Sequence, residues 1–341
     1  MITLDGTLGI TTPTYGGAVT AEYSVPVTGF KNRLINGQMM IDQRNAGGVI
    51  NLSGSNQYPV DRFITSMDTA ATVTAQQSST APTGFTNSLL ISVTSGTAPS
   101  ATNENRITQR IEGFNTADLG FGAAGASTVT LSFWVRCSLT GTFSGSLRNS
   151  AASRSYPFTY TINSANTWEQ KSITVAGDTS GTWIGATNGT GLQVTIDLGS
   201  GSTMKGTANA WASANYLGVT GSTNLIANSG ATFYITGVQL EKGSTATSFD
   251  YRPYGTELQL CQRYYETGGF VSFTTGGVNG IYQPIQFKCT KRVAAASCTS
   301  TNGRSLTMNI FNDATGVATG MYQGSNDSGA SVSTWTVSAE L

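Results

Sequence analysis

Histidine is absent from this chain of 341 residues. Without it the chain has no Ser-His-Asp or Cys-His nucleophilic system, no imidazole metal ligand and no histidine general acid or base. Charged residues make up only 11% of the chain, and the 18 basic and 18 acidic side chains cancel. The composition therefore shows no electrostatic footprint for nucleic acid or for an anionic membrane, and we expect neither as a partner.

Cysteine is scarce and long apolar runs are missing. The four cysteines, Cys137, Cys261, Cys289 and Cys298, form no C-x-x-C pair and are too few for a disulfide scaffold, although the short spacing of the last two leaves a hairpin disulfide open. No stretch approaches 18 apolar residues, and the first residues lack the basic and apolar regions of a signal peptide. We expect a chain without a signal peptide or membrane insertion, synthesised in a reducing, cytosolic compartment.

Glycine is abundant, with 41 residues, and from Phe63 onward apolar residues alternate with polar ones in short runs between Gly, Ser, Thr, Asn and Asp clusters. This period of two is typical of β-strands. The predicted core residues are Val129, Leu131, Phe133, Val135, Val194, Ile196, Phe233 and Ile235. Trp134 and Arg136 fall on the opposite face of their strand. In residues 231–240 the alternation shifts by one at Gly237, which predicts a β-bulge.

Many short strands without a βαβ rhythm predict an all-β fold, a jelly-roll β-sandwich with an extended N-terminal arm and a smaller C-terminal β-domain. We place the arm at residues 1–30, the jelly roll at 31–254, and a short helical connector with the C-terminal β-domain at 255–341. Thr256 and Gln259 match a capping box, which predicts a helix from Glu257 to about Glu266. Asn279-Gly280 and Asn302-Gly303 predict tight turns in the last domain.

Two motifs suggest enzymes, and each has a simpler interpretation. Gly120, Gly122 and Gly125 satisfy G-x-G-x-x-G, but a predicted strand follows them where a dinucleotide site needs a helix, so a flexible turn is favoured. The acid pairs that deserve testing as glycosidase carboxylates are Glu104 with Glu112 and Asp178 with Asp197. No catalytic residue is predicted, no cofactor is expected, and a structural Ca²⁺ held by such scattered oxygens has no EF-hand pattern to support it.

Aromatic residues are the leading candidates for ligand contacts. Trp183 and Trp211 lie among small and polar residues, where we expect exposed rings, and Tyr216 follows in the same kind of segment. Exposed rings on a β scaffold stack on the apolar faces of sugars. Trp134 and Arg136 form a second candidate patch. The alternative is that these rings pack inside the chain or against another subunit.

Five stretches carry a resemblance to a known family. They read LINGQMMIDQR at 34–44, YPVDRF at 58–63, FYITGVQLEKG at 233–243, FDYRPY at 249–254 and CQRYYE at 261–266. In this order they resemble bacteriophage tail-fibre and related virion proteins that carry a carbohydrate-binding-module-like jelly roll. The resemblance covers roughly residues 31–266, and it supplies no sugar-contact residues to carry over.

The resemblance implies a virion protein, a homotrimer that contacts other virion proteins through its N-terminal arm, and recognition of host-surface polysaccharide. The first functional hypothesis is therefore a tail fibre that mediates host attachment without catalysis. A capsid-bound head fibre or decoration protein with no specific ligand is one alternative. A polysaccharide-degrading tail spike is the other. If the Trp183 region does not bind ligand, the C-terminal aromatics Tyr282, Tyr322 and Trp335 are the next candidates.

Overall fold

The computed structural model describes residues 30–269, 287–293 and 335–341 in full, and of the remaining chain it gives only strands. The chain divides into two units, Met1–Phe30 and Lys31–Leu341. In the first unit the paired strands β1 (Leu4–Asp5) and β2 (Gly9–Ile10) are assigned. The predicted role of the N-terminal arm in contacting other subunits lies outside the described residues.

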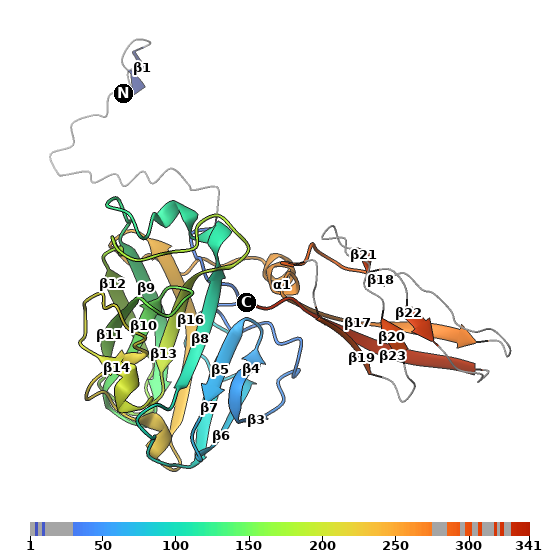
Figure 1. The fold of residues 1–341 in the computed structure, drawn as a ribbon, viewed down its shortest axis with the longest axis horizontal. Helices are drawn as coiled ribbons and strands as arrows, with labels where there is room; N and C mark the ends of the chain where they lie inside the picture. Colours follow the sequence, from blue (N-terminus) through green and yellow to red (C-terminus); the bar gives the residue numbers. More distant parts are fainter. Residues whose placement is uncertain are drawn as a thin grey trace. The chain divides into compact units, whose positions relative to one another are not determined.

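Two six-stranded antiparallel sheets face each other in the second unit (Figure 1). The first, called the β9 sheet, has the order β12-β9-β16-β7-β6-β3, and the second, called the β13 sheet, has the order β11-β10-β13-β8-β5-β4. The β9 sheet contains β3 (Ile50–Leu52), β6 (Thr72–Ser78), β7 (Ser88–Ser95), β9 (Val129–Cys137), β12 (Glu169–Val175) and β16 (Thr232–Lys242). The β13 sheet contains β4 (Gly54–Val60), β5 (Phe63–Met67), β8 (Asn105–Glu112), β10 (Gly141–Arg148), β11 (Ser155–Ile162) and β13 (Thr190–Asp197). The prediction of an all-β, jelly-roll sandwich is confirmed.

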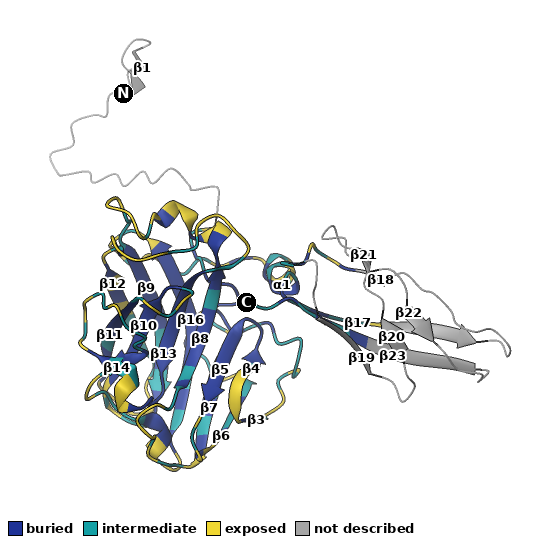
Figure 2. Ribbon diagram, in the orientation of Figure 1, coloured by how far each residue is buried: buried dark blue, intermediate teal, exposed yellow. Residues whose placement is uncertain are grey.

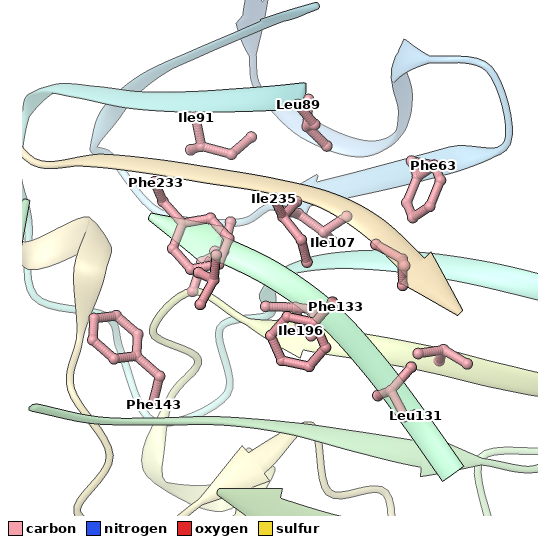
Figure 3. Close-up of a cluster of buried hydrophobic side chains, with 14 of the residues drawn as sticks. Phe63, Leu89, Ile91, Ile107, Leu131, Phe133, Phe143, Ile196, Phe233 and Ile235 are labelled. Carbon is pink, nitrogen blue, oxygen red and sulfur yellow. The ribbon is translucent and has the colours of Figure 1, made fainter. Parts of the chain in front are cut away.

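The core lies between the two sheets, where side chains from β9, β16 and β13 meet (Figure 3). All eight predicted core residues are at most 4% exposed. Trp134 and Arg136 are half-buried on the outer side of β9, as the alternation requires. Most strand residues of the two sheets are buried or intermediate, and exposed residues lie mainly in the connecting loops (Figure 2). The sandwich begins earlier than Phe63, however, because the short strands β3 and β4, in a Gly- and Asn-rich stretch that obscures their alternation, already pair within the sheets.

The β-bulge at Gly237 is confirmed. Register between β16 and β9 shifts between Thr236 and Gln239, and Gly237 adopts a φ of 61°. A Cβ at this position would lie 2.7 Å from the Phe85 ring and 3.1 Å from the Trp134 ring. The glycine is therefore required twice, for its left-handed backbone and for the space that two rings occupy.

The predicted helix is real but its bounds were wrong. Helix α1 spans Tyr254–Gln262, and no side chain caps it. Pro253 at the N-cap has φ −54°, which suits the entry to a helix, so the helix begins ahead of the Thr256 capping box. Glu257 lies inside α1, where its carboxylate accepts the backbone N–H of Asn36 and faces the Arg252 guanidinium. The start of β17 at Tyr265 keeps the helix from reaching Glu266.

Beyond α1 the chain returns to strands. β17 (Tyr265–Thr274), β23 (Gly329–Ser338) and β19 (Ser297–Thr301) form a sheet in the order β17-β23-β19. Two strand pairs accompany it, β18 (Ile285–Gln286) with β21 (Val317–Ala318) and β20 (Leu306–Met308) with β22 (Met321–Gln323). The turns predicted at Asn279-Gly280 and Asn302-Gly303 lie outside the described residues. Cys289 is a free thiol, so the disulfide alternative is not realised.

Candidate functional site

The outer face of the β9 sheet carries a row of aromatic rings. On β9 the outward side chain of Trp134 lies between Gln170 of β12 and Thr236 of β16 in register. Two residues along β9, Arg136 lies opposite Tyr234, with its guanidinium 4.9 Å from the ring centroid. Since these side chains project from paired strands, their relative positions are set by the sheet.

Further rings extend this row in both directions. On one side Trp168 packs edge to face on Tyr234 at 6.1 Å, and on the other Phe85, Phe249 and Tyr251 pack together at 5.0–5.7 Å. Together they form what we call the outer aromatic row: Phe85, Trp134, Trp168, Tyr234, Phe249 and Tyr251. Each ring is half-buried except Tyr251, which is 55% exposed. So much aromatic surface open to solvent on one face is typical of an interaction site.

Trp183 and Trp211 are half-buried rather than exposed, which corrects the expectation from the sequence. Their rings meet edge to face at 5.5 Å, Phe121 packs on Trp183 at 4.9 Å, and Tyr156 packs on Trp211 at 5.3 Å. Both indole N–H groups donate to backbone carbonyl oxygens, at 3.1 and 2.8 Å. The rings are less exposed than expected because the glycine-rich turn that contains Phe121 folds over them. Their assignment as sugar contacts stays a prediction.

That turn also explains the G-x-G-x-x-G motif. Gly120 ends the short 3₁₀ helix η2 (Ala117–Leu119) with a φ of 64°, and β9 follows, so no helix N-terminus faces the motif. A Cβ on Gly122, at φ 88°, would lie 3.1 Å from the Trp183 ring. The pocket that Phe121, Trp183 and their neighbours line holds only about 40 Å³. This is room for a few water molecules and not for a sugar ring.

Tyr216 belongs to a segment, residues 199–224, that crosses the outer face of the β13 sheet. The segment contains the parallel pair β14 (Lys205–Gly206) and β15 (Gly218–Val219), and Ala212 bridges to Ser155 of β11. The Tyr216 ring packs on Gly206, where a Cβ would come within 2.3 Å of it. No ring contact joins Tyr216 to Trp183 or Trp211 in the part of the chain that the structure describes. The three leading candidates therefore do not form one site.

The first pair of acids cannot act together. Glu104 and Glu112 lie at the two ends of β8, about 27 Å apart at the rise of an extended strand, while glycosidase carboxylates lie about 5–10 Å apart. Glu104 pairs with Arg106 at 2.7 Å. Glu112 accepts hydrogen bonds from Arg263 and from the Tyr264 hydroxyl, both at 2.6 Å.

The second pair is also committed to local contacts. Asp178 binds Arg154 through both oxygens at 2.7 Å and accepts the backbone N–H of Ser180, the Asx turn expected of it. Asp197 lies 3.5 Å from Lys205 and accepts backbone N–H groups of the following turn. Within the described residues no group of three acidic or cysteine side chains is placed to hold a metal ion, and no helix is long and apolar enough to cross a membrane.

Three of the five stretches that carried the family resemblance, 34–44, 58–63 and 261–266, meet in a buried cluster, which we call the polar junction. Arg62, 1% exposed, pairs with Glu340 and stacks on the Tyr264 ring at 3.5 Å. Arg44 pairs with both Asp61, at 3.2 Å, and Glu340, at 2.9 Å. The polar junction consists of Arg44, Tyr58, Asp61, Arg62, Tyr264 and Glu340. It joins the sandwich to the end of the C-terminal sheet.

Burial shifts the pKa values in the polar junction. The pKa of Asp61 rises to about 6, mainly because burial disfavours its charged form. The positive charge of Arg44 opposes this shift but is the weaker effect. The pKa of Tyr58 rises to about 12 for the same reason, assisted by the charge of Glu340. The motif residues in this cluster thus hold the structure together, and sequence reasoning missed their role because the pairs join residues up to 296 positions apart.

No protein-family model and no curated protein matches this chain. Among solved structures, the enzymatically active domain of tailspike protein 4 from bacteriophage CBA120 matches 62% of this chain at 13% identity and a TM-score of 0.34, and the match spans 22% of that tailspike chain. The family 11 carbohydrate-binding module of a Clostridium thermocellum cellulosomal cellulase matches 59% of this chain and 99% of its own at 10% identity and a TM-score of 0.30. At these TM-scores the function has to be argued from the residues of this chain.

Proposed function

We propose that this chain is a non-catalytic virion fibre protein that attaches to host-surface glycan through the outer aromatic row. The observation that supports the proposal is the row itself, six rings on one face of a sheet, each at least partly accessible. Aromatic faces contribute about 1 kcal/mol each when they stack, so several rings in line suit the successive units of a polysaccharide. The strands β9 and β16 hold Trp134 and Tyr234 in fixed positions, which favours binding.

Polar side chains flank the row at its centre. Gln170 is exposed and lies beside Trp134, and Arg136 is held by the Asn166 carbonyl oxygen at 2.8 Å. An amide and a guanidinium next to a ring supply the hydrogen bonds that sugar hydroxyl groups need once the ring has stacked. The Trp183 and Trp211 cluster offers less, because its N–H groups are already used and its pocket is small.

The virion location and the homotrimer rest on the family resemblance. In a trimer three outer aromatic rows engage one surface together, and such multivalency raises avidity by a factor of about 10² or more. The separation of Glu104 and Glu112, about 27 Å at the rise of an extended strand, supports a protein that binds without cleaving. A decoration protein without a ligand and a polysaccharide-degrading tail spike are the competing functions that the tests must separate.

The first test measures binding of the full-length chain to purified host envelope polysaccharide. Trp134→Ala is expected to weaken binding about tenfold, while Trp134→Tyr, which keeps a ring, retains most of it. Trp211→Ala is the matched control and is expected to leave binding unchanged. If Trp211→Ala abolishes binding and Trp134→Ala does not, the contact surface is the other cluster and the row is not the site.

The second test separates the functional classes. We expect no release of reducing sugar from the polysaccharide, because Glu104 and Glu112 lie too far apart and Asp178 and Asp197 are engaged by Arg154 and Lys205. Release of reducing sugar by the purified chain contradicts the non-catalytic proposal and favours the tail spike. Absence of any binding to polysaccharide contradicts glycan attachment and favours the decoration protein.

A further inference from the structure

Several arginines lie on the outer face of the β13 sheet. Arg148 of β10, Gln193 of β13 and Arg110 of β8 lie side by side in register. Neighbouring strands are about 4.8 Å apart, so the two arginines flank Gln193 at about 10 Å between their Cα atoms. Arg106 lies four residues from Arg110 on the same face of β8, beyond Thr108. A single cross-strand row therefore presents two guanidinium groups, with a third farther along the same face.

Arg148 has no negative partner. It is 2% exposed, and its Nη1 and Nη2 donate to two neutral amide oxygens, Asn215 Oδ1 at 2.6 Å and Gln193 Oε1 at 3.2 Å. Its Nε has no hydrogen-bond partner, and no carboxylate lies within 4.0 Å among the described residues. The other basic residues of this face each have a negative or carbonyl partner: Arg62 with Glu340, Arg106 with Glu104, Lys205 with Asp197 and Arg110 with the Leu341 backbone oxygen.

The surroundings increase the free-energy cost of this charge. Burial, with a smaller contribution from the positive charges of Arg106 and Arg110, lowers the pKa of Arg148 to about 9. Next to Arg148 on β10, the fully buried Ser146 has a hydroxyl group without a partner, and Thr195 and Thr108 continue that row of hydroxyl groups across the sheet. The Thr108 and Thr195 hydroxyl groups bond each other at 3.1 Å, so the unsatisfied hydroxyl group is that of Ser146. A buried positive charge beside an unsatisfied hydroxyl group is stabilised when an anion with polar substituents binds.

We propose that this face binds the carboxylate of an acidic sugar. The guanidinium groups of Arg148 and Arg110 contact the carboxylate from either side of Gln193, since arginine suits planar, bidentate recognition of carboxylates. The hydroxyl groups of Ser146 and Thr195 face the sugar ring. The segment 199–224, which contacts Arg148 through Asn215, must move locally to admit the ligand. The site lies on the opposite sheet from the outer aromatic row, so it does not depend on the function proposed above.

The experiment titrates the full-length chain with sodium glucuronate by calorimetry, with glucose and sodium sulfate as comparison ligands at equal ionic strength. Glucuronate is expected to bind and to raise the thermal midpoint. Glucose, which lacks the carboxylate, is expected to bind at least tenfold more weakly, and so is sulfate, which lacks the hydroxyl groups. Equal binding of glucose or of sulfate overturns the assignment of an acidic sugar.

Variants of Arg148 test its role in binding glucuronate. Arg148→Met is expected to weaken glucuronate binding at least tenfold while its thermal midpoint without ligand stays equal or rises, since an uncompensated buried charge has been removed. Arg33→Met is the control, because Arg33 already binds Asp118 through two hydrogen bonds at 2.8 Å. Unchanged glucuronate binding in Arg148→Met overturns the proposal. If that variant does not fold, Arg110→Met, at a half-buried position, must show the same loss of binding.

Discussion

The two outer faces of the sandwich differ, although the strands of both sheets alternate in the same way. The β9 sheet presents rings to solvent, with Trp134 and Tyr234 half-buried and Tyr251 exposed. The β13 sheet presents hydroxyl groups and arginines, and segment 199–224 covers part of it, so that Ser146 and Arg148 are as buried as core residues. Alternation thus determines which side chains point into the core. The segments that cover each sheet determine how exposed the outward-pointing side chains are.

The largest difference in free energy of unfolding is expected between substitutions of two neighbouring residues of β9. Phe133 points into the core and is fully buried, so Phe133→Ala is expected to lower the free energy of unfolding by about 3–5 kcal/mol. Trp134 points outward, and Trp134→Ala is expected to lower it by about 1 kcal/mol. Urea unfolding measures both. Equal losses would show that the outer aromatic row is as much a part of the core as Phe133.

The second comparison uses two buried arginines, Arg62 of the turn between β4 and β5 and Arg148 of β10, which are 1% and 2% exposed. Arg62→Met removes one of the two arginine partners of the buried Glu340, which keeps only Arg44, and is expected to cost about 3 kcal/mol. Arg148→Met leaves no carboxylate unpaired and is expected to cost nothing or to stabilise the chain. Urea unfolding at neutral pH distinguishes them. A loss of similar size in both variants contradicts the uncompensated charge on Arg148.

The polar junction is expected to make stability depend on pH. The pKa of Asp61 is about 6 in the folded chain against an ordinary value of 3.8, so the folded state holds this proton more tightly. The free energy of unfolding therefore falls as pH rises from 4 to 6, by about 2 kcal/mol for this group. Asp61→Asn is expected to remove that part of the slope in urea titrations at pH 4, 5 and 6. An unchanged slope contradicts the raised pKa.

The smallest difference in free energy of unfolding is expected in the aromatic cluster that contains Trp183 and Trp211. Trp211 is half-buried and packs on three rings, so Trp211→Ala is expected to lower the free energy of unfolding by about 2 kcal/mol. Gln170→Ala, at an exposed position, serves as the control and is expected to change it by less than about 0.5 kcal/mol. A Trp211→Ala chain as stable as the control supports the rings as free ligand contacts instead.

Regular alternation made much of the sandwich predictable. Residues 128–137 specify β9 and its inward face, and the single shift at Gly237 specifies the bulge, because both are local consequences of side-chain direction. The start of α1 was not predicted, since the capping box and Pro253 are both valid local signals and the tertiary contacts of Glu257 favour the earlier start.

The candidate sites were less predictable because their contacts span long sequence separations. Arg148 meets Asn215, 67 residues away in a segment without periodicity, so nothing local signals its burial. Phe121 covers Trp183 from a turn whose glycines suggest only flexibility. Tyr234, in contrast, was within reach of sequence reasoning, because the alternation of β16 already places it on the outer face beside Trp134 and Arg136.

The polar junction has a mechanical consequence. The C-terminal sheet leaves the sandwich through the covalent link at Arg263 and Tyr264, and it is fastened a second time where Glu340, after β23, meets Arg44 and Arg62. β17 and β23 pair in antiparallel register from Tyr265 and Ser338 onward, so both anchors lie at the same end of one ladder. A torque applied to that ladder must strain two attachments instead of twisting one connector, and a pulling force is divided between a peptide bond and a buried ion-pair cluster.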